Sequence, residues 1–260
     1  WLGLACFLGL LAIVMGNGLA LKTRQLKVAA LRQENPAPAR DMARRLSGAL
    51  QIETISRPKQ VNPNFKQLEA LLQAYFPLVH QKLSPQIINQ QGLLLHFPGK
   101  NPQEPAVLLL AHLDVVPVES AIHWKYPPFS GKIAGGYVWG RGAIDDKQSA
   151  LAILEALEAL LRQGQRPERT VYIAFGYDEE IGGARGAAYL AKTLTKQGVE
   201  CGFSLDEGLA IVPGSMIGLK PPVALIGLSE KGYLSVELTA EQAGGHASMP
   251  PPETAVGLLA

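Results

Sequence analysis

The sequence LLLAHLDVVP, from Leu108 to Pro117, is the part of the chain that most clearly predicts its fold. Its apolar part, residues 107–111, is typical of a strand of a parallel sheet that is buried on both faces. His112 and Asp114 follow where the strand's carboxyl end opens into a crevice, which is where open α/β sheets bind ligands. Residues i and i+2 of an extended chain point the same way, so both side chains can serve one site. The pair fits a metal-binding histidine with a carboxylate on its second nitrogen; the alternative is a surface histidine beside an unrelated aspartate.

Acidic residues also follow two further predicted strands, 170–177 and 202–205, and precede a predicted helix over 147–161. They are Asp145, Asp146, Asp178, Glu179, Glu180, Asp206 and Glu207. One aspartate is enough to cap a helix, so the second one at the helix start needs another explanation. Three adjacent carboxylates repel one another, and a cation removes that repulsion. For each cluster taken alone, the alternative is a solvated acidic loop that caps a helix.

Parallel strands joined by right-handed crossovers gather their carboxyl ends on one edge of a sheet. One histidine and several carboxylates suit zinc, and the number of ligands suffices for two ions. Two ions ~3.5–4 Å apart share a bridging carboxylate and a bridging water, whose pKa they lower. A carboxylate beside the ions but not bound to them can act as general base. Glu179 and Glu180 are suited to divide the roles of base and ligand.

The composition excludes several classes of protein. With 260 residues, 18% charged and 47% hydrophobic, the chain is long and apolar enough for one large globular domain. A net charge of +2, without a basic stripe carrying interleaved aromatic residues, argues against nucleic-acid binding. The two cysteines, Cys6 and Cys201, lie in different contexts, which excludes a disulfide framework and argues against a cysteine-based zinc site.

Residues 1–21 carry no charged side chain, and a helix of this length spans a hydrocarbon core of ~30 Å. We expect a transmembrane anchor or a signal peptide with a small-x-small cleavage pattern over residues 18–20, in preference to a buried core helix. The protein is then membrane-anchored or exported to a periplasmic, extracellular or lumenal location. The basic residues that follow favour a cytoplasmic body, but the charge preceding Trp1 also counts, so the orientation stays open. Residues 22–40 are expected to form a linker, and Asp41 is the expected N-cap of the next helix.

Seven motifs occur in one order over about residues 108–250: HLDVVP, PPFSG, GRGAIDDK, YDEEIGG, SLDEG, EKGYLSVEL and GGHASMP. With them the chain resembles the co-catalytic zinc peptidases and amidohydrolases that include carboxypeptidase S, aminoacylases, carnosinase and acetylornithine deacetylase. The sequences of these motifs are most similar to those of the carboxypeptidase S branch, which also contains hydrolases of N-fatty-acyl amino acids. The resemblance implies an α/β fold: a mixed, mostly parallel sheet flanked by helices, with an inserted α+β lid or dimerisation domain. We expect the catalytic domain over residues 41–229 and the start of the lid over residues 230–260.

The resemblance also implies the metal ligands. His112 would bind one of two zinc ions, and Asp145 would bridge both ions. Glu180 would bind the ion opposite His112, and Asp206 would share the ion held by His112. The choice between Asp206 and the neighbouring Glu207 depends on alignment alone. The family needs a fifth ligand, a histidine after the lid, which no residue of this chain matches, so we expect that ligand outside the chain.

Three further residues receive catalytic roles from the same resemblance. Asp114 would orient the imidazole of His112, and Glu179 would be the general base. His246, in GGHASMP, matches a lid histidine that stabilises the oxyanion or the substrate carboxylate, often across a dimer interface, which implies a homodimer through the lid. The implied activity is zinc-dependent cleavage of a peptide or N-acyl amide bond next to a free carboxylate. An aminoacylase-like N-acyl amino acid amidohydrolase and a non-catalytic binding domain on the same fold are the alternatives.

Overall fold

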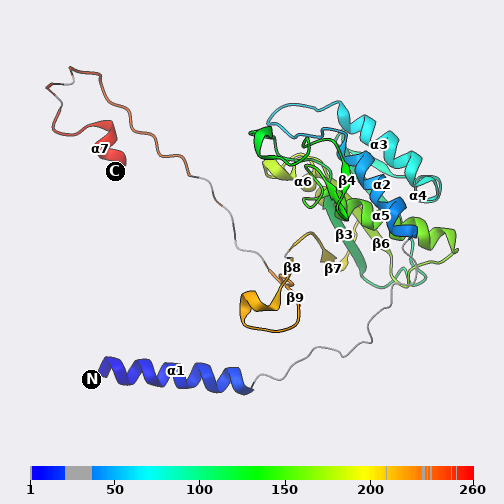
Figure 1. The fold of residues 1–260 in the computed structure, drawn as a ribbon, viewed down its shortest axis with the longest axis horizontal. Coiled ribbons are helices and arrows are strands. Elements are labelled where there is room, and N and C mark those ends of the chain that lie inside the picture. The colour runs from blue at the N-terminus through cyan, green and yellow to red at the C-terminus, as the bar shows by residue number, and fades with distance from the viewer. Residues whose placement is uncertain are drawn as a thin grey trace.

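The computed structural model describes residues 2–20, 37–208, 210–229, 232, 234, 236–246, 248–249 and 251–260. Figure 1 shows its helices and strands. The helices are α1 (Leu2–Ala20), α2 (Ala37–Leu50), α3 (Asn64–Tyr75), α4 (Pro77–Leu83), α5 (Lys147–Arg162), α6 (Ala187–Lys196) and α7 (Ala255–Leu259). The strands are β1 (Gln86–Ile88), β2 (Gly92–Phe97), β3 (Ala106–His112), β4 (Lys132–Ala134), β5 (Tyr137–Trp139), β6 (Val171–Gly176), β7 (Cys201–Leu205), β8 (Ile211–Val212) and β9 (Val223–Ala224).

The central sheet is mixed, as predicted, with the strand order β1-β2-β6-β3-β7. Strand β3, which carries LLLAH, pairs in parallel with β6 on one side and with β7 on the other. The pairs β1–β2 and β2–β6 are antiparallel. The three parallel strands therefore end on the same edge of the sheet, and each of them is followed by one of the predicted acidic segments.

Helices cover both faces of this sheet, which confirms the predicted α/β class (Figure 1). Leu93 and Leu95 of β2 pack in the larger core with α2, α3, α4 and α5, whereas the intervening Leu94 packs with α6 on the other face. The alternation follows from the period of two along a strand. On α5 the core-facing leucines are spaced three or four apart, as on an amphipathic helix: Leu151, Leu154, Leu157 and Leu161, with Ala150 beside them.

The pattern of apolar residues in the sequence predicts one helix over 65–79 and one strand over 87–97, and in the structure both are divided by turns. The apolar run 87–97 forms the hairpin β1–β2, because Asn89 and Gln90 adopt positive φ angles of 45° and 82° and turn the chain. The predicted helix over 65–79 ends at Tyr75, and Pro77 starts α4. Proline has no N–H to donate, which is tolerated only in the first turn of a helix.

Helix α2 begins at Ala37, four residues before the predicted N-cap Asp41, so the predicted linker 22–40 extends too far. Pro38 falls in the first turn of α2, where its missing N–H costs no intrahelical hydrogen bond. Asp41 lies inside the helix and pairs with Arg44 at 2.6 Å. The part of the linker over residues 21–36 lies outside the described residues.

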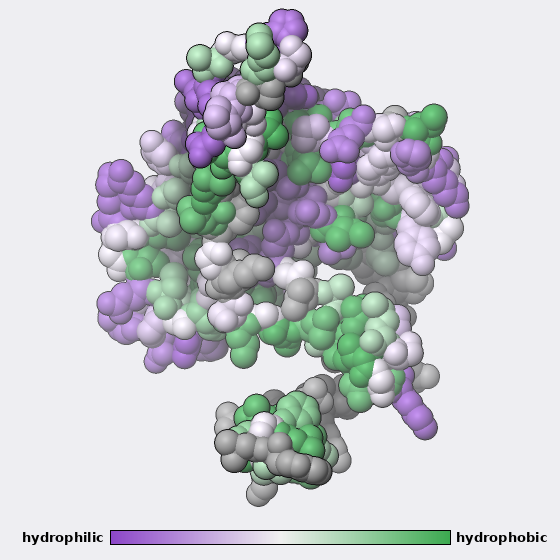
Figure 2. All heavy atoms as spheres, turned by 90° about the vertical axis from the view of Figure 1, so that its left-hand side faces the viewer, coloured by the Kyte–Doolittle hydropathy of each residue, from purple (hydrophilic) through white to green (hydrophobic). Residues whose placement is uncertain are grey.

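Helix α1 is long and apolar enough to cross a membrane. Over Gly3–Ala20 its mean hydropathy is 2.0, and none of it is buried. The surface of α1 that faces the viewer at the bottom of Figure 2 is hydrophobic. A signal sequence has the same length and composition, so both predicted alternatives remain for this segment.

Candidate active site

The ends of the parallel strands bring the predicted acidic segments to one edge of the sheet. His112, at the end of β3, pairs in register with Gly176 at the end of β6, and Leu109 pairs with Leu205 at the end of β7. Residues 178–180 and 206–207 therefore leave the sheet beside His112. Asp145 and Asp146 reach the same edge from the N-terminus of α5.

His112 is buried at 2% exposure, and its two ring nitrogens face different groups. Nε2 lies 2.8 Å from Oδ1 of Asp145, 3.6 Å from a carboxylate oxygen of Glu207 and 3.8 Å from one of Glu179. Nδ1 lies 3.1 Å from the backbone oxygen of Asp114 and 3.3 Å from its carboxylate. This is the orientation that a metal-binding histidine needs, with one nitrogen toward the ligand cluster and the other on a supporting acid.

Asp114 also holds the two glutamates after β6. It is fully buried, and its carboxylate oxygens accept hydrogen bonds from the backbone N–H groups of Glu179 and Glu180, each at 3.1 Å. Burial raises the pKa of Asp114, but the hydrogen bond and the charge of His112 lower it, and the net shift is downward. Asp114 is therefore ionised and fixes the imidazole and the Glu179–Glu180 backbone together.

Two groups of side chains offer ligand atoms within 4.8 Å of one another. One is His112, Asp145 and Glu180; the other is His112, Asp146 and Glu207. Asp146 is almost fully buried, and its Oδ1 has no hydrogen-bond partner among the described residues. An orphaned buried carboxylate oxygen is costly unless a cation or a donor reaches it. The oxygen-rich donor set with one imidazole fits a divalent metal ion.

The acids around His112 change its protonation. Burial lowers the pKa of His112, but the hydrogen bond and charge of Asp114 and the charges of Glu207 and Glu179 raise it to about 10. The pKa of Glu207 is raised to about 7, mainly by burial. Burial also raises the pKa values of Glu179 and Glu180, with neighbouring carboxylates adding to the rise. The negative charges around His112 therefore stabilise a positive charge beside its ring, as the acids of a cation site do.

Asp206 and Glu207 take different positions in the structure. Glu207 reaches His112, whereas Oδ1 of exposed Asp206 accepts the backbone N–H of Glu207 at 2.9 Å. Asp206 lies near enough to Glu179 to raise its pKa. The assignment of Asp206 as a ligand stays a prediction. The short distance between Glu207 and His112 supports Glu207 as the alternative ligand.

Asp178 has the capping role that was the alternative for this acidic segment. It is buried, and its two carboxylate oxygens accept the N–H groups of Arg185 and Gly186, both at 2.7 Å, at the start of α6. A Cβ at Gly186 would lie 2.5 Å from Oδ1 of Asp178, so only glycine allows this close approach. Of the three adjacent acids, only Glu179 and Glu180 are free to face the cluster.

Sequence reasoning missed Lys147, which follows Asp145 and Asp146 directly. Its side chain has 0% exposure, and Nζ donates hydrogen bonds to the backbone oxygens of Ala49 and Ile52 at 3.0 and 2.7 Å. Burial lowers its pKa to about 7, against an opposing effect of Asp114. Its place beside two candidate ligands was the only available signal.

His246 is described as an exposed residue. Its Nδ1 lies 2.8 Å from Oγ of Ser248, and among the described residues it makes no contact with the cluster. Its predicted catalytic role stays a prediction.

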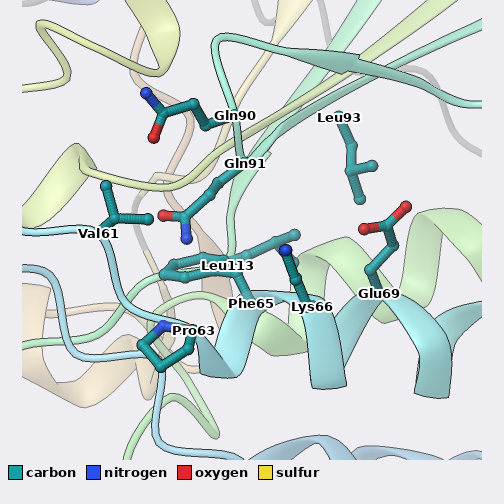
Figure 3. A pocket seen from close by; sticks show the side chains of 9 residues that line it. All are labelled: Val61, Pro63, Phe65, Lys66, Glu69, Gln90, Gln91, Leu93 and Leu113. Carbon is teal, nitrogen blue, oxygen red and sulfur yellow. The ribbon is translucent and has the colours of Figure 1, made fainter.

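A cavity of about 340 Å³ lies apart from the cluster, between α3 and the turn that joins β1 to β2 (Figure 3). Its lining includes Phe65, Leu93 and Leu113. Leu113 stands between His112 and Asp114 in the sequence, and neighbours in extended chain point to opposite sides. The cavity therefore does not contain the candidate ligands.

The chain has relatives of known family. The model of peptidase family M20/M25/M40 matches residues 108–256. The N-fatty-acyl-amino acid synthase/hydrolase PM20D1 of Xenopus tropicalis is 40% identical over 219 residues, which cover 83% of this chain and 43% of that protein. The probable carboxypeptidase S-like 2 of Dictyostelium discoideum is 38% identical over 265 residues, covering 97% of this chain and 51% of that protein. The chain thus spans about half the length of these relatives.

Solved structures show the same fold. Human carnosine dipeptidase 1 matches 67% of this chain and 40% of its own at a TM-score of 0.53 and 21% identity. The M20 family metallo-carboxypeptidase Sso-CP2 from Sulfolobus solfataricus matches 66% of this chain and 38% of its own at a TM-score of 0.52 and 23% identity. The motifs, the mixed sheet and the acidic strand ends thus have one origin: the chain belongs to peptidase family M20/M25/M40.

Proposed function

We propose that the protein is a metal-dependent hydrolase that cleaves a peptide or N-acyl amide bond next to a free carboxylate. The observation that carries the proposal is the cluster around His112, in which Nε2 faces Asp145, Glu179 and Glu207. The relatives support the substrate class, because their names describe a carboxypeptidase S-like protein and an N-fatty-acyl-amino acid hydrolase.

The metal ligands of this chain are His112, Asp145, Glu180 and Asp206, and Glu207 is the alternative to Asp206. We infer two zinc ions, of which His112 binds one, because imidazole and carboxylates suit zinc and the acidic side chains around His112 offer enough donors for a second ion. When bound, the ions lower the pKa of a water and polarise the scissile carbonyl.

Glu179 is the general base. Its side chain is 52% exposed, with a carboxylate oxygen 3.8 Å from Nε2 of His112, and Asp114 holds its backbone N–H. It accepts a proton from the attacking water and delivers it to the leaving amine. Burial is the main cause of its raised pKa, and a raised pKa suits a general base that takes up a proton near neutral pH.

The remaining parts of the proposal concern the molecule around the site. Helix α1 anchors the protein in a membrane or directs its export, which its length and hydropathy support. Residues 41–229 belong to the catalytic domain, and a lid or dimerisation domain begins at about residue 230. His246 contacts the substrate from this lid across the interface of a homodimer.

Substitution of the base tests the mechanism. In the whole protein, Glu179→Gln should lower kcat by about 10²- to 10⁴-fold because it removes proton transfer. The zinc content should stay unchanged, since Glu179 is not a ligand. Glu168→Gln, an exposed position before the start of β6 and thus at the opposite end of that strand from residues 178–180, is the matched control and should keep full activity. Hydrolysis at the wild-type rate by Glu179→Gln would refute the assignment.

The substrate class is tested with a panel of dipeptides and N-acyl amino acids, each with a free and an amidated carboxylate. Turnover only of the free acids supports the proposal, and the preferred acyl group separates a carboxypeptidase from an aminoacylase-like amidohydrolase. Zinc binding without hydrolysis of any member would instead favour a binding domain on this fold.

A further inference from the structure

Lys147 is a buried lysine for which the proposed mechanism has no use. Its side chain has 0% exposure, and within the described part of the chain it forms no ion pair with an acid. Its ammonium group is instead bound by two backbone oxygens, those of Ala49 and Ile52. Burying an ammonium group costs free energy, so these two contacts need an explanation.

The two carbonyls belong to the C-terminal end of α2 and to the segment that follows it. That segment, residues 52–56, runs beside the end of β3: Thr54 Oγ1 donates to the oxygen of Leu113 at 2.6 Å, and Val115 N donates to the oxygen of Thr54 at 3.1 Å. Leu113 and Val115 flank Asp114. The segment that Lys147 holds is therefore attached to the strand end that carries His112 and Asp114.

The backbone of Lys147 directly follows Asp145 and Asp146 in the chain. The packing around its stem is close, because a Cβ at Gly142 would lie 2.9 Å from Val115 and 3.3 Å from Cδ of Lys147. Gly142 thus leaves the space that the lysine needs between the ligand loop and β3. Its φ of +84° also favours glycine.

We propose that Lys147 is a positioning residue of the metal site, which fixes Asp145 at ligand distance from His112 by tying the start of α5 to segment 52–56. The inference rests on the proposed metal site. Metal ligands must be held within about 0.5 Å of the productive geometry. Loss of a supporting contact outside the ligand set costs about 10- to 100-fold in metal affinity.

The alternative is that Lys147 merely docks α2, since a lysine at the last carbonyls of a helix stabilises that helix. The ion pair between Arg45 and Glu155 supplies the control, because it also joins α2 to α5, with Nη2 2.8 Å from a carboxylate oxygen. None of the candidate ligands takes part in this pair. If docking were the only role, Arg45→Met and Lys147→Met would affect the metal site equally.

The experiment compares Lys147→Met, which keeps the length of the side chain, with Arg45→Met in the whole protein. The readouts are the zinc dissociation constant, from competition with a chromogenic chelator, and the visible spectrum of the Co²⁺-substituted protein, which reports coordination geometry. We expect Lys147→Met to bind zinc about 10- to 100-fold more weakly with a changed cobalt spectrum. Arg45→Met should lose stability but keep both metal properties. If Lys147→Met does not fold, Lys147→Gln keeps one N–H donor on a shorter chain and should show a smaller loss.

Wild-type zinc affinity and an unchanged cobalt spectrum in the folded Lys147 variant would overturn the inference, as would equal losses in both variants. Absence of metal binding by the wild-type protein would instead overturn the proposed function, so the two failures are distinguishable.

Discussion

At the scale of single residues, Asp114 connects His112 with the two glutamates that follow β6. Its carboxylate contacts the imidazole of His112, and its two carboxylate oxygens accept hydrogen bonds from the backbone N–H groups of Glu179 and Glu180. Because the residue is fully buried, no water replaces a lost contact. The orienting role that the resemblance implied for Asp114 is therefore only part of what its position allows.

Asp114→Asn should weaken zinc binding about 10- to 100-fold and lower the free energy of unfolding by about 1–3 kcal/mol. The amide nitrogen of asparagine donates, so one buried N–H of Glu179 or Glu180 loses its acceptor. Zinc competition and urea unfolding measure the two effects. Asp41→Asn, which removes an exposed carboxylate paired with Arg44, is the control and should change neither. Wild-type values for the Asp114 variant would contradict this account.

The protonation of His112 gives a pH prediction for the metal-free protein. Its pKa of about 10 in the folded state lies above the ordinary value of 6.5. The stability that it contributes is thus fully present below pH 6.5 and is lost as the pH rises to about 10. Over this interval the loss reaches about 1.4 kcal/mol per pH unit.

Urea unfolding with a chelator between pH 7.5 and 9.5 checks this prediction. Lys147, with a pKa lowered to about 7, contributes the opposite slope, because its folded form binds fewer protons above that pH. The quantity to measure is therefore the difference in the free energy of unfolding between the wild type and His112→Asn. This difference should fall as the pH rises. A constant difference would show that His112 does not hold its proton in the folded protein.

Among the elements, segment 52–56 supports the end of β3 without being a strand of the sheet. Its contacts with residues 113–115 are one isolated bridge, Ile55 with Val115, and the hydrogen bonds of Thr54 and Ser56. The position of His112 and Asp114 therefore depends on a segment that lies about 60 residues earlier in the chain.

Thr54→Val should lower the free energy of unfolding by about 1–3 kcal/mol, because it leaves the buried oxygen of Leu113 without the Thr54 donor. The control is Thr195→Val, which removes a hydrogen bond of 2.9 Å to Ala191 on the exposed side of α6, where water can replace it. Urea unfolding of both variants measures the difference. Equal losses in the two variants would mean that the buried Thr54 hydrogen bond contributes no more to the free energy of unfolding than an exposed one.

At the scale of the whole molecule, the collected carboxylates link metal binding to stability. Among the described residues, the acids near His112 outnumber the cations, so the folded metal-free protein keeps unfavourable charge repulsion. A ligand that binds only the folded state stabilises it, by about 2.7 kcal/mol at a free concentration of 100 times its dissociation constant.

Removal of metal from the whole protein with a chelator should therefore lower the midpoint of thermal unfolding, and added Zn²⁺ should restore it. Mg²⁺, which binds imidazole poorly, is the matched control ion and should restore little. Calorimetry with and without chelator measures the shift. An unchanged midpoint would contradict a metal site in the folded protein.

Local patterns in the sequence predict the class of fold and the edge of the sheet at which the cluster around His112 lies. An apolar strand, a histidine two residues before an aspartate, and acids after two further strands are local patterns, and parallel pairing brings such strand ends together. Helix α5 was predicted nearly to its ends for the same reason, because amphipathic spacing is local. These patterns predicted that the acidic segments gather beside His112, and the structure places them there.

The contacts of each acid, in contrast, depend on how distant segments pack. Asp178 caps α6 while its neighbours Glu179 and Glu180 face His112, and Glu207 rather than Asp206 lies within ligand distance of that histidine. Lys147 binds carbonyls about 95 residues earlier in the chain. These roles depend on which backbone N–H or C=O group comes within about 3 Å of a side chain. Distant segments set that distance when they pack, so residue type and spacing do not encode it.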